Sequence, residues 1–491
     1  MNEYSLRLIL VPVYLSLFCS LHAQNEGTEN LSADSILFVR PKPVKTAIQI
    51  AGLNVGVWAF DRYVLKGEWA YIGLNSMKRN IRKGFVWDND QFSTNLFAHP
   101  YNGGLYFNAA RSNGMLLREA ALYSVGGSLI WEYLMENELP SLNDLITTSI
   151  GGVCLGEITF RLSDLLIDDR TFGWERFGRE FFAALVSPMR GFNRIISGEA
   201  WKIRNISGRR EKVLPVQYYV TIGYKGLTES RKNKFDQSMY VDLKLYYNNI
   251  FSEENEKPYD AFIFNTQFNF FSYQPVISKI NVLSQIWGKN IRLKNKRFDL
   301  HWGVFQHFDY YDSKAVFEGE SINSYKISQA AAFGIGGQFR TNLIGENSLV
   351  VSSYLNGVLL GGSITDYYRM LERDYNMGSG FNAKAYIWFR FGTKAELAAS
   401  IEKYRLFTWK GYDPNIDLSQ LTLDEQSNLN IQGDKGVTDF TVLNLNFNYC
   451  FCKHYIFSIG TSYYLRNSRY KFFPNVKNKV FENKVGLGYT F

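Results

Sequence analysis

The second half of the chain, residues 213–491, alternates apolar and polar side chains with a period of two. In residues 440–452, one face takes leucines, aromatic residues and a threonine, while the other takes mainly asparagines and two cysteines. The same division recurs in residues 240–247. Because successive side chains of a β-strand point to opposite faces, this half of the chain is predicted to form a sheet.

The kinds of side chain on the two faces of each strand distinguish a membrane barrel from a soluble β-sandwich. The polar faces carry Asn, Gln and charges of both signs, and the apolar faces end in aromatic residues, as in strands with lipid outside and a polar interior. We count about twelve such segments, and single-chain bacterial barrels use even strand numbers. Tight joins alternate with long polar stretches at 314–326, 365–380, 409–439 and 467–479. We predict an α+β fold: a transmembrane antiparallel β-barrel of about 12 strands over 213–491, preceded by a mainly α-helical domain.

The last strand-like stretch ends at Phe491, with apolar and aromatic residues at alternate positions before it. This ending resembles the signal that the barrel assembly machinery of the outer membrane reads. The sequence therefore predicts this machinery and outer-membrane lipids as partners, and the bacterial outer membrane as the location. A barrel of about 12 strands can hold a small channel or a plug but not the whole helical domain, so this domain is expected on the periplasmic side.

The first 23 residues have the pattern of a signal peptide: Arg7 ends a short charged region, an apolar run follows, and the segment closes at Ala23. Cys19 offers a lipoprotein alternative, although the bulky Phe18 stands where such signals take a small residue. Residues 24–45 are polar and are expected to form a linker.

Residues 46–205 are predicted to be helical, with no apolar stretch long enough to cross a bilayer. Ser141 is expected to cap a helix, with Asp144 in its first turn. That helix carries Thr148, Gly152 and Gly156 at four-residue spacing, which allows a second helix to approach closely. The segment 126–128 is expected to supply the facing residues.

The helical region carries several long motifs: Trp87-Asp-Asn-Asp-Gln-Phe92, His99-Pro-Tyr101, Tyr106-Phe-Asn-Ala-Ala-Arg-Ser-Asn-Gly114, Trp131-Glu-Tyr133, Pro140-Ser-Leu-Asn-Asp144 and Gly151-Gly152…Gly156-Glu157. These motifs resemble an uncharacterised domain family (domain of unknown function) of Gram-negative outer-membrane proteins. The resemblance covers roughly residues 50–205 and implies a helical domain followed by a barrel, without a known activity. A looser likeness links the domain to VanZ-like membrane proteins, through the order His99, Glu132, Ser141, Asp144 and Gly152.

One candidate catalytic site combines His99 with the carboxylates of Glu132, Asp144 or Glu157. A histidine paired with a carboxylate is able to activate water or a hydroxyl, so this set predicts an acid–base site for an envelope lipid-modifying enzyme. The alternative is structural: His99 begins a helix, and the glutamates bond backbone groups or the arginines at 111 and 161.

A second candidate is a polar cluster in the barrel interior. Asp299, His301, His307 and Asp309 share one face of their strand, which the alternation places toward the lumen. These residue types are able to bind a metal when they converge; the alternative is a polar lining of hydrogen-bonded side chains. Lumen charges of both signs favour an ion-paired or plugged interior over a selective pore.

The net charge of +8 is spread along the chain, which argues against a nucleic-acid partner. No motif indicates a cofactor. The leading hypothesis is a non-enzymatic envelope protein, either a conduit or a lipid-binding scaffold. The alternative is the lipid-modifying enzyme described above.

Overall fold

The computed structural model describes residues 36–490, with gaps in the loops. The predicted signal peptide, most of the predicted linker and Phe491 therefore lie outside the described residues. The chain forms two compact units: residues up to 88 with 93–213, and residues 89–92 with 214–491. Within 36–490 the residues left out are 89, 230–233, 273, 293–297, 314, 318–319, 323–324, 344, 369–372, 423–424 and 427–428.

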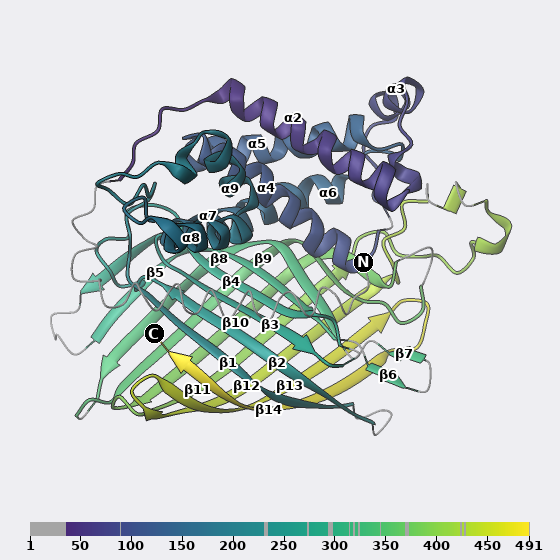
Figure 1. The fold of residues 1–491 in the computed structure, drawn as a ribbon. Coiled ribbons are helices and arrows are strands. Elements are labelled where there is room, and N and C mark those ends of the chain that lie inside the picture. The colour runs from purple at the N-terminus through teal and green to yellow at the C-terminus, as the bar shows by residue number, and fades with distance from the viewer. Residues whose placement is uncertain are drawn as a thin grey trace. The chain divides into compact units, whose positions relative to one another are not determined.

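The first unit is helical, as predicted (Figure 1). Its first described helix begins at Pro43 rather than at residue 46. Proline is accepted in the first turn of a helix, because the amide hydrogen that it lacks would have no partner within the helix. The helices are α2 (Pro43–Phe60), α3 (Leu74–Lys83), α4 (His99–Ser112), α5 (Leu117–Ile130), α6 (Leu142–Ile146), α7 (Gly152–Leu166), α8 (Gly173–Val186) and α9 (Pro188–Ile196).

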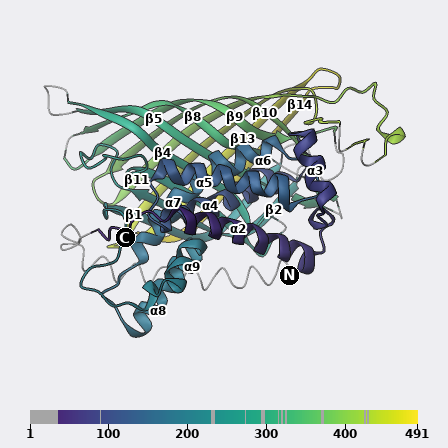
Figure 2. The ribbon, with the colours of Figure 1, turned by 90° about the horizontal axis from the view of Figure 1, so that it is seen from above.

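A close helix crossing between α4 and α7 forms the centre of this unit (Figure 2). A Cβ added at Gly103 of α4 would lie 1.7 Å from the carbonyl oxygen of Thr148, and one added at Gly152 would lie 2.6 Å from Gly103. The predicted close approach is confirmed, but the predicted partner is wrong. Gly126 has no neighbour within 4 Å of its added Cβ, because α4 rather than α5 occupies the small-residue face of α7.

α6 continues through residues 147–151 into α7, so one helix runs from Leu142 to Leu166. By length and composition this helix could cross a membrane, which corrects the expectation that no stretch of this region is long enough. Most of the apolar stretch of this helix is buried among the other residues of the structure, as in a helix that forms the core of a folded domain. We therefore treat it as the core of the helical unit.

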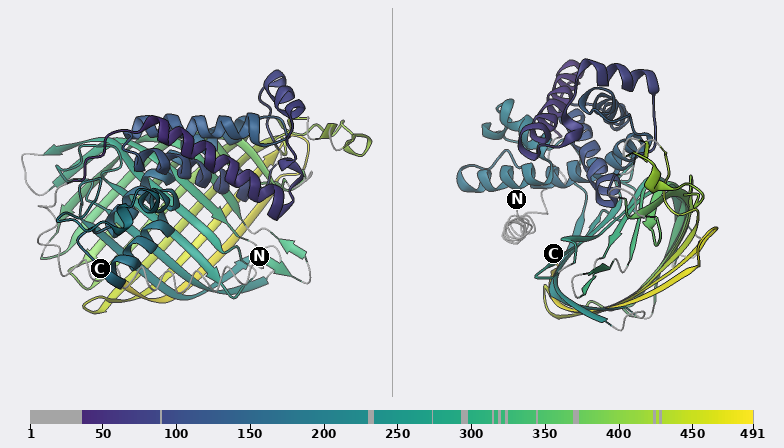
Figure 3. Two further views of the ribbon diagram at one scale, coloured as in Figure 1. Left: turned by 45° about the horizontal axis from the view of Figure 1, so that its top comes forward. Right: turned by 90° about the vertical axis from the view of Figure 1, so that its right-hand side faces the viewer.

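The second unit is a closed antiparallel barrel of twelve strands among the described residues, which confirms the predicted fold class (Figure 1; Figure 3). β1 pairs with β14 and closes the sheet, and β6–β7 form a separate hairpin in the loop after β5. The strands are β1 (Val216–Glu229), β2 (Lys234–Tyr247), β3 (Phe262–Phe270), β4 (Ile277–Arg292), β5 (Phe298–Asp312), β6 (Ala315–Phe317), β7 (Glu320–Ile322), β8 (Lys326–Asn342), β9 (Ser348–Ile364), β10 (Tyr375–Phe391), β11 (Ala395–Thr408), β12 (Gly436–Cys452), β13 (Tyr455–Tyr470) and β14 (Val476–Thr490).

The faces of the strands follow the predicted alternation. On β12, Leu443, Leu445 and Phe447 are exposed on the outside, whereas Phe440 and Val442 are buried in the interior. Such an apolar outer wall around a closed sheet is the architecture of an outer-membrane barrel. One loop prediction is wrong: the stretch 467–479 is mostly strand, because β13 and β14 pair as far as Ser468 and Val476.

Candidate functional site

His99 and Asp144 lie close together in the helical unit. His99 is the first residue of α4, and Asp144 stands in the first turn of α6, where its amide donates to the hydroxyl of the capping Ser141 (3.3 Å). The imidazole Nε2 of His99 is 3.5 Å from the Asp144 carboxylate oxygen Oδ2, and both side chains are mostly buried. The predicted cap is confirmed, and it places the carboxylate beside the imidazole.

Glu132 belongs to the same buried neighbourhood. Its carboxylate accepts a hydrogen bond from the Ser141 amide at 2.7 Å, and its side chain is 1% exposed. Burial raises the pKa of Glu132 to about 7, although the nearby His99 acts in the opposite direction. A carboxyl group that titrates near neutral pH beside a histidine has the electrostatics of a general acid–base pair.

Glu157 does not join this site. Its carboxylate accepts hydrogen bonds from Arg161 (Nε, 2.8 Å) and from Arg111 (Nε, 2.9 Å), and all three side chains are largely buried. Arg111 also pairs with Glu211, which follows the last helical turn of the unit. The structural alternative is therefore the correct description of the contacts of Glu157, which tie α4 to α7.

An apolar groove of about 650 Å³ lies between α2 and α5. Its walls come from both helices and from the residues just before them, and Glu119 is its single charged lining residue among those described. The sequence analysis did not find this groove, although the glycine pair in α5 was a usable signal, since glycines leave room beside a helix. The lining residues are Pro41, Pro43, Ala47, Ile50, Met115, Glu119, Leu122, Tyr123, Gly126, Gly127 and Ile130.

The hairpin of α8 and α9 exposes a broad apolar face. Trp174 is 87% exposed, while the arginines on the other side of the same helix are buried and ion-paired. Aromatic residues dominate this face, which suits the interface between lipid headgroups and acyl chains. Its exposed members are Phe172, Trp174, Phe177, Phe181, Leu185, Phe192, Ile195, Ile196, Trp201 and Ile203.

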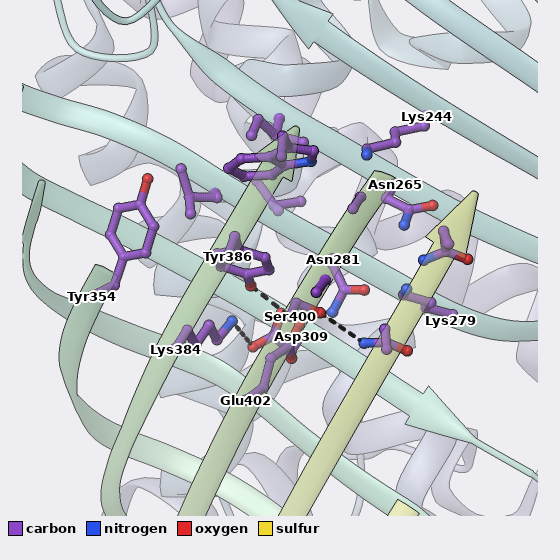
Figure 4. A pocket seen from close by; sticks show the side chains of 18 residues that line it. Lys244, Asn265, Lys279, Asn281, Asp309, Tyr354, Lys384, Tyr386, Ser400 and Glu402 are labelled. Carbon is purple, nitrogen blue, oxygen red and sulfur yellow. Dashed lines mark hydrogen bonds and ion pairs between the residues drawn. The ribbon is translucent and has the colours of Figure 1, made fainter. Parts of the chain in front are cut away.

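In the barrel, Asp309 lies at the centre of a buried polar network (Figure 4). Its carboxylate pairs with Lys384 of β10 and accepts hydrogen bonds from Asn281 (2.7 Å) and from the Tyr404 hydroxyl (2.9 Å). Glu402 of β11 accepts from the hydroxyls of Tyr311 and Tyr386. The Tyr404 hydroxyl lies within hydrogen-bond distance of both carboxylates and shares its single proton between Asp309 and Glu402. A cavity of about 120 Å³ lies against this network, lined also by Lys244 and Lys279.

The other members of the predicted lumen cluster face the interior but do not converge. Asp299 pairs with Arg340 at 2.6 Å, and the His301 Nδ1 lies 2.7 Å from the side-chain oxygen of Asn290. His307 packs edge-on against Tyr354. Asp299 and Asp309 are ten residues apart on one strand, a separation of roughly 33 Å. The described geometry is therefore a polar lining and not a metal site built from these four residues.

A layer of packed, buried side chains lies in the barrel interior and adjoins the buried polar network. We call this layer the aromatic plug; it consists of rings from several walls, and it includes a stacked pair, Tyr325 and Tyr464, with centroids 4.0 Å apart. Tyr325 directly precedes β8 and so lies at the end of the barrel that carries the long loops. The plug residues are Tyr311, Tyr325, Tyr404, Phe440 and Tyr464, with Leu227, Val442 and Val480 packed around them.

Residues 84–189 match the family model described as "Domain of unknown function (DUF3943)". This stretch contains His99, Glu132, Asp144 and Glu157, and the match confirms the resemblance to an uncharacterised domain family. The likeness to VanZ-like proteins is not supported by it. No curated protein matches the chain.

The chain is similar to solved outer-membrane proteins at low identity. The NanC porin shares 10% identity over 54% of this chain and 98% of its own, with a TM-score of 0.26. OmpT of Vibrio cholerae shares 9% identity over 56% and 97%, with a TM-score of 0.24. Omp33 of Acinetobacter baumannii shares 8% identity over 57% and 100%, with a TM-score of 0.22.

Proposed function

We propose that this protein is an outer-membrane lipid-binding scaffold: a closed barrel that anchors a helical unit, whose groove holds the acyl chain of a lipid. The observation that carries the proposal is the groove of about 650 Å³ between α2 and α5. Its volume falls in the range of small-molecule sites, and its lining is almost wholly apolar. An exposed apolar groove of this size is costly in water, and an acyl chain would cover it.

Gly126 supplies a direct test, because it lines the groove and a Cβ atom added there would have no other atom within 4 Å. We expect Gly126→Leu to fold normally and to lose most of the lipid that co-purifies with the protein. Gly56→Leu on α2 is the matched control, since Gly56 also has free space but does not line the groove. Mass spectrometry of organic extracts from both detergent-purified variants measures the loss. Equal lipid content in the two variants would contradict the proposal.

The contacts in the barrel interior give less support to the other part of the leading hypothesis, in which the protein is a conduit. The aromatic plug and the buried Lys384–Asp309 pair occupy the interior where a solute would have to pass. Charges of opposite sign are paired with one another rather than arranged in rings of one sign, as a selective pore requires. These contacts favour a barrel that serves as an anchor.

We further propose that the helical unit lies on the periplasmic side. The chain enters the barrel at the start of β1, Val216. The start of β1 pairs with the end of β14, and the end of β14 pairs with the start of β13. The entry point therefore lies at the same end of the barrel as the tight turn 453–454, which directly precedes β13. Short turns of such barrels face the periplasm, so a domain joined to β1 at this end would be periplasmic. Protease treatment of intact and permeabilised cells tests this, since cleavage of the helical unit should require permeabilisation.

The second candidate is the lipid-modifying enzyme, favoured by the contact of His99 with Asp144 and by the near-neutral pKa of Glu132. Under this hypothesis, His99→Ala should abolish a lipid species that also disappears when the whole protein is absent. Mass spectrometry of outer-membrane lipids measures this outcome, with heat-modifiable gel mobility showing that the barrel is folded. An unchanged lipid profile in both strains would reject the enzyme.

A further inference from the structure

A small, strongly cationic pocket of about 60 Å³ lies in the helical unit, between α9, the start of α2 and the segment that follows the last helix. Five of its lining residues are basic and only Glu199 is acidic. The basic residues belong to a part of the chain that carries seven arginines between positions 176 and 210, together with two lysines near the start of α2. The basic lining residues are Lys42, Lys45, Arg190, Arg194 and Arg210.

Arg190 is the most deeply placed of these cations, with 2% of its surface exposed. One of its terminal nitrogens pairs with Asp164, and the guanidinium lies over the Phe160 ring with 4.3 Å to the ring centroid. Its Nε and Nη1 have no hydrogen-bond partner among the residues that the structure describes. Buried donors of a charged group without acceptors are costly, so an acceptor from outside the chain fits this position.

The carboxylates of Asp164, Asp169 and Glu180 near the pocket already form hydrogen bonds or ion pairs within the chain. Asp164 accepts hydrogen bonds from the amides of Arg210 and Glu211 in addition to its pairing with Arg190. Arg194 is held by Asp169 and Glu180. Burial lowers the pKa of Lys45 and brings that of Arg210 down to about 10, and neighbouring cations add to both shifts.

The cationic pocket and the apolar groove share two segments of the chain. Along the start of α2, Lys42 and Lys45 line the pocket, while the intervening Pro43 lines the groove. After α4, Asn113 lines the pocket and Met115 lines the groove. A polar, cationic site and an apolar site that adjoin in this way match the two ends of an amphiphile.

We propose that the cationic pocket binds the phosphate group of a lipid whose acyl chain occupies the groove. Arginine and lysine recognise phosphate oxygens through charge-assisted hydrogen bonds. Among the described residues that line the pocket, the donors without an acceptor are Nε and Nη1 of Arg190, Nη1 of Arg194 and the hydroxyl of Ser112. This inference rests on the proposed lipid-binding function and names the headgroup chemistry. Free phosphate shares that chemistry, so the experiment separates the two sources.

The test is isothermal titration calorimetry of the full-length protein in a neutral detergent, with two probes: a short-chain phosphatidic acid below its critical micelle concentration, and inorganic phosphate. The variant Lys42→Gln/Lys45→Gln removes two cations that have no ion pair in the described structure, so it should fold normally. We expect it to weaken phosphatidic acid binding by about tenfold or more. Lys78→Gln, an exposed lysine on α3, is the matched control and should bind as the parent does.

The outcomes separate the phosphate site from the groove. Tight binding of phosphatidic acid that the double variant weakens and Lys78→Gln does not supports the inference. Equal binding by the double variant and the parent overturns it; if Gly126→Leu still abolishes lipid binding in that case, the lipid-binding function stands alone. Phosphatidic acid that binds no more tightly than inorganic phosphate would also overturn it, because the site would then serve the free anion.

Discussion

At the scale of single residues, Glu132 should make stability depend on pH. Its pKa is raised from 4.5 to about 7 by burial, with Asp88 adding to the rise and His99 and Glu136 opposing it. The folded state therefore binds the proton more tightly than the unfolded state, and stability falls as pH rises from about 4.5 to 7. The loss is of order 3 kcal/mol. Denaturation followed by helical circular dichroism at pH 5 and 8 measures it.

Glu132→Gln should remove most of this pH dependence, since the amide oxygen still accepts from the Ser141 amide but carries no titrating proton. Glu68→Gln is the control, because Glu68 is exposed and its replacement should leave the slope of the parent. An equal slope in Glu132→Gln and the parent would show that another group is responsible.

The contacts between candidate site residues were harder to predict than the identity of the candidates. His99 and Asp144 were predictable as candidates because few histidines are present, and the cap at Ser141 fixes where Asp144 lies. Glu157, which the sequence analysis grouped with them, instead contacts Arg111 and Arg161, and these contacts depend on how α4 crosses α7. Local sequence patterns describe one helix at a time and contain no information about this crossing.

At the scale of elements, the crossing of α4 and α7 should tolerate no side chain at Gly103. A Cβ there would lie 1.7 Å from the Thr148 oxygen, so the two helices would have to separate. We expect Gly103→Ala to destabilise the helical unit by about 3 kcal/mol or more. Gly52→Ala on α2, with open space around it, should be neutral or stabilising by up to about 1 kcal/mol. Chemical denaturation followed at 222 nm compares the two, and equal stability would contradict the described crossing.

The apolar face of α8 and α9 leads to a prediction about the bilayer. Phe177 is 56% exposed on this face, and we expect a spin label at Phe177→Cys to lie in the lipid interface when the full protein is in nanodiscs. The label should then collide more with oxygen than with a water-soluble nickel complex. A label at Lys78→Cys, exposed on α3, should show the opposite preference. The background carries alanine in place of Cys154, Cys450 and Cys452. Equal accessibility of both labels to the nickel complex would show that this face is not at the membrane.

Strands were more predictable than helix packing, for a physical reason. The period of two is clear in strands such as β9, β12 and β14, where one side faces lipid and the other faces the interior. Such a strand can be recognised without its neighbours. On β12 this separates Leu443 and Phe447 from Asn444 and Asn446. The partner of α7 could not be recognised in this way, because small residues at four-residue spacing show that a helix approaches without showing which one.

At the scale of the whole molecule, the interior of the barrel decides whether the protein conducts. The plug draws residues from β1, β5, β11, β12, β13 and β14 and from Tyr325 just before β8, so its contacts cross from one wall to the other. Tyr404 of β11 also bonds Asp309 of β5, four strands away in the sheet. A cavity of about 120 Å³ lies against the polar network, and the described plug side chains pack against one another beside it. We therefore expect the folded barrel to show no discrete conductance steps in a planar bilayer.

Removing the stacked pair with Tyr325→Ala/Tyr464→Ala should open a path, since the two rings come from the start of β8 and from β13, five strands apart in the sheet. We expect conductance steps in this variant, together with a loss of stability, because each truncation of a buried ring costs about 3–5 kcal/mol. Phe447→Ala changes an exposed ring on the outer wall and should remain without conductance. Steps of similar size in the parent and in the double variant would mean that solutes pass the plug, and the barrel would then be a conduit in addition to an anchor.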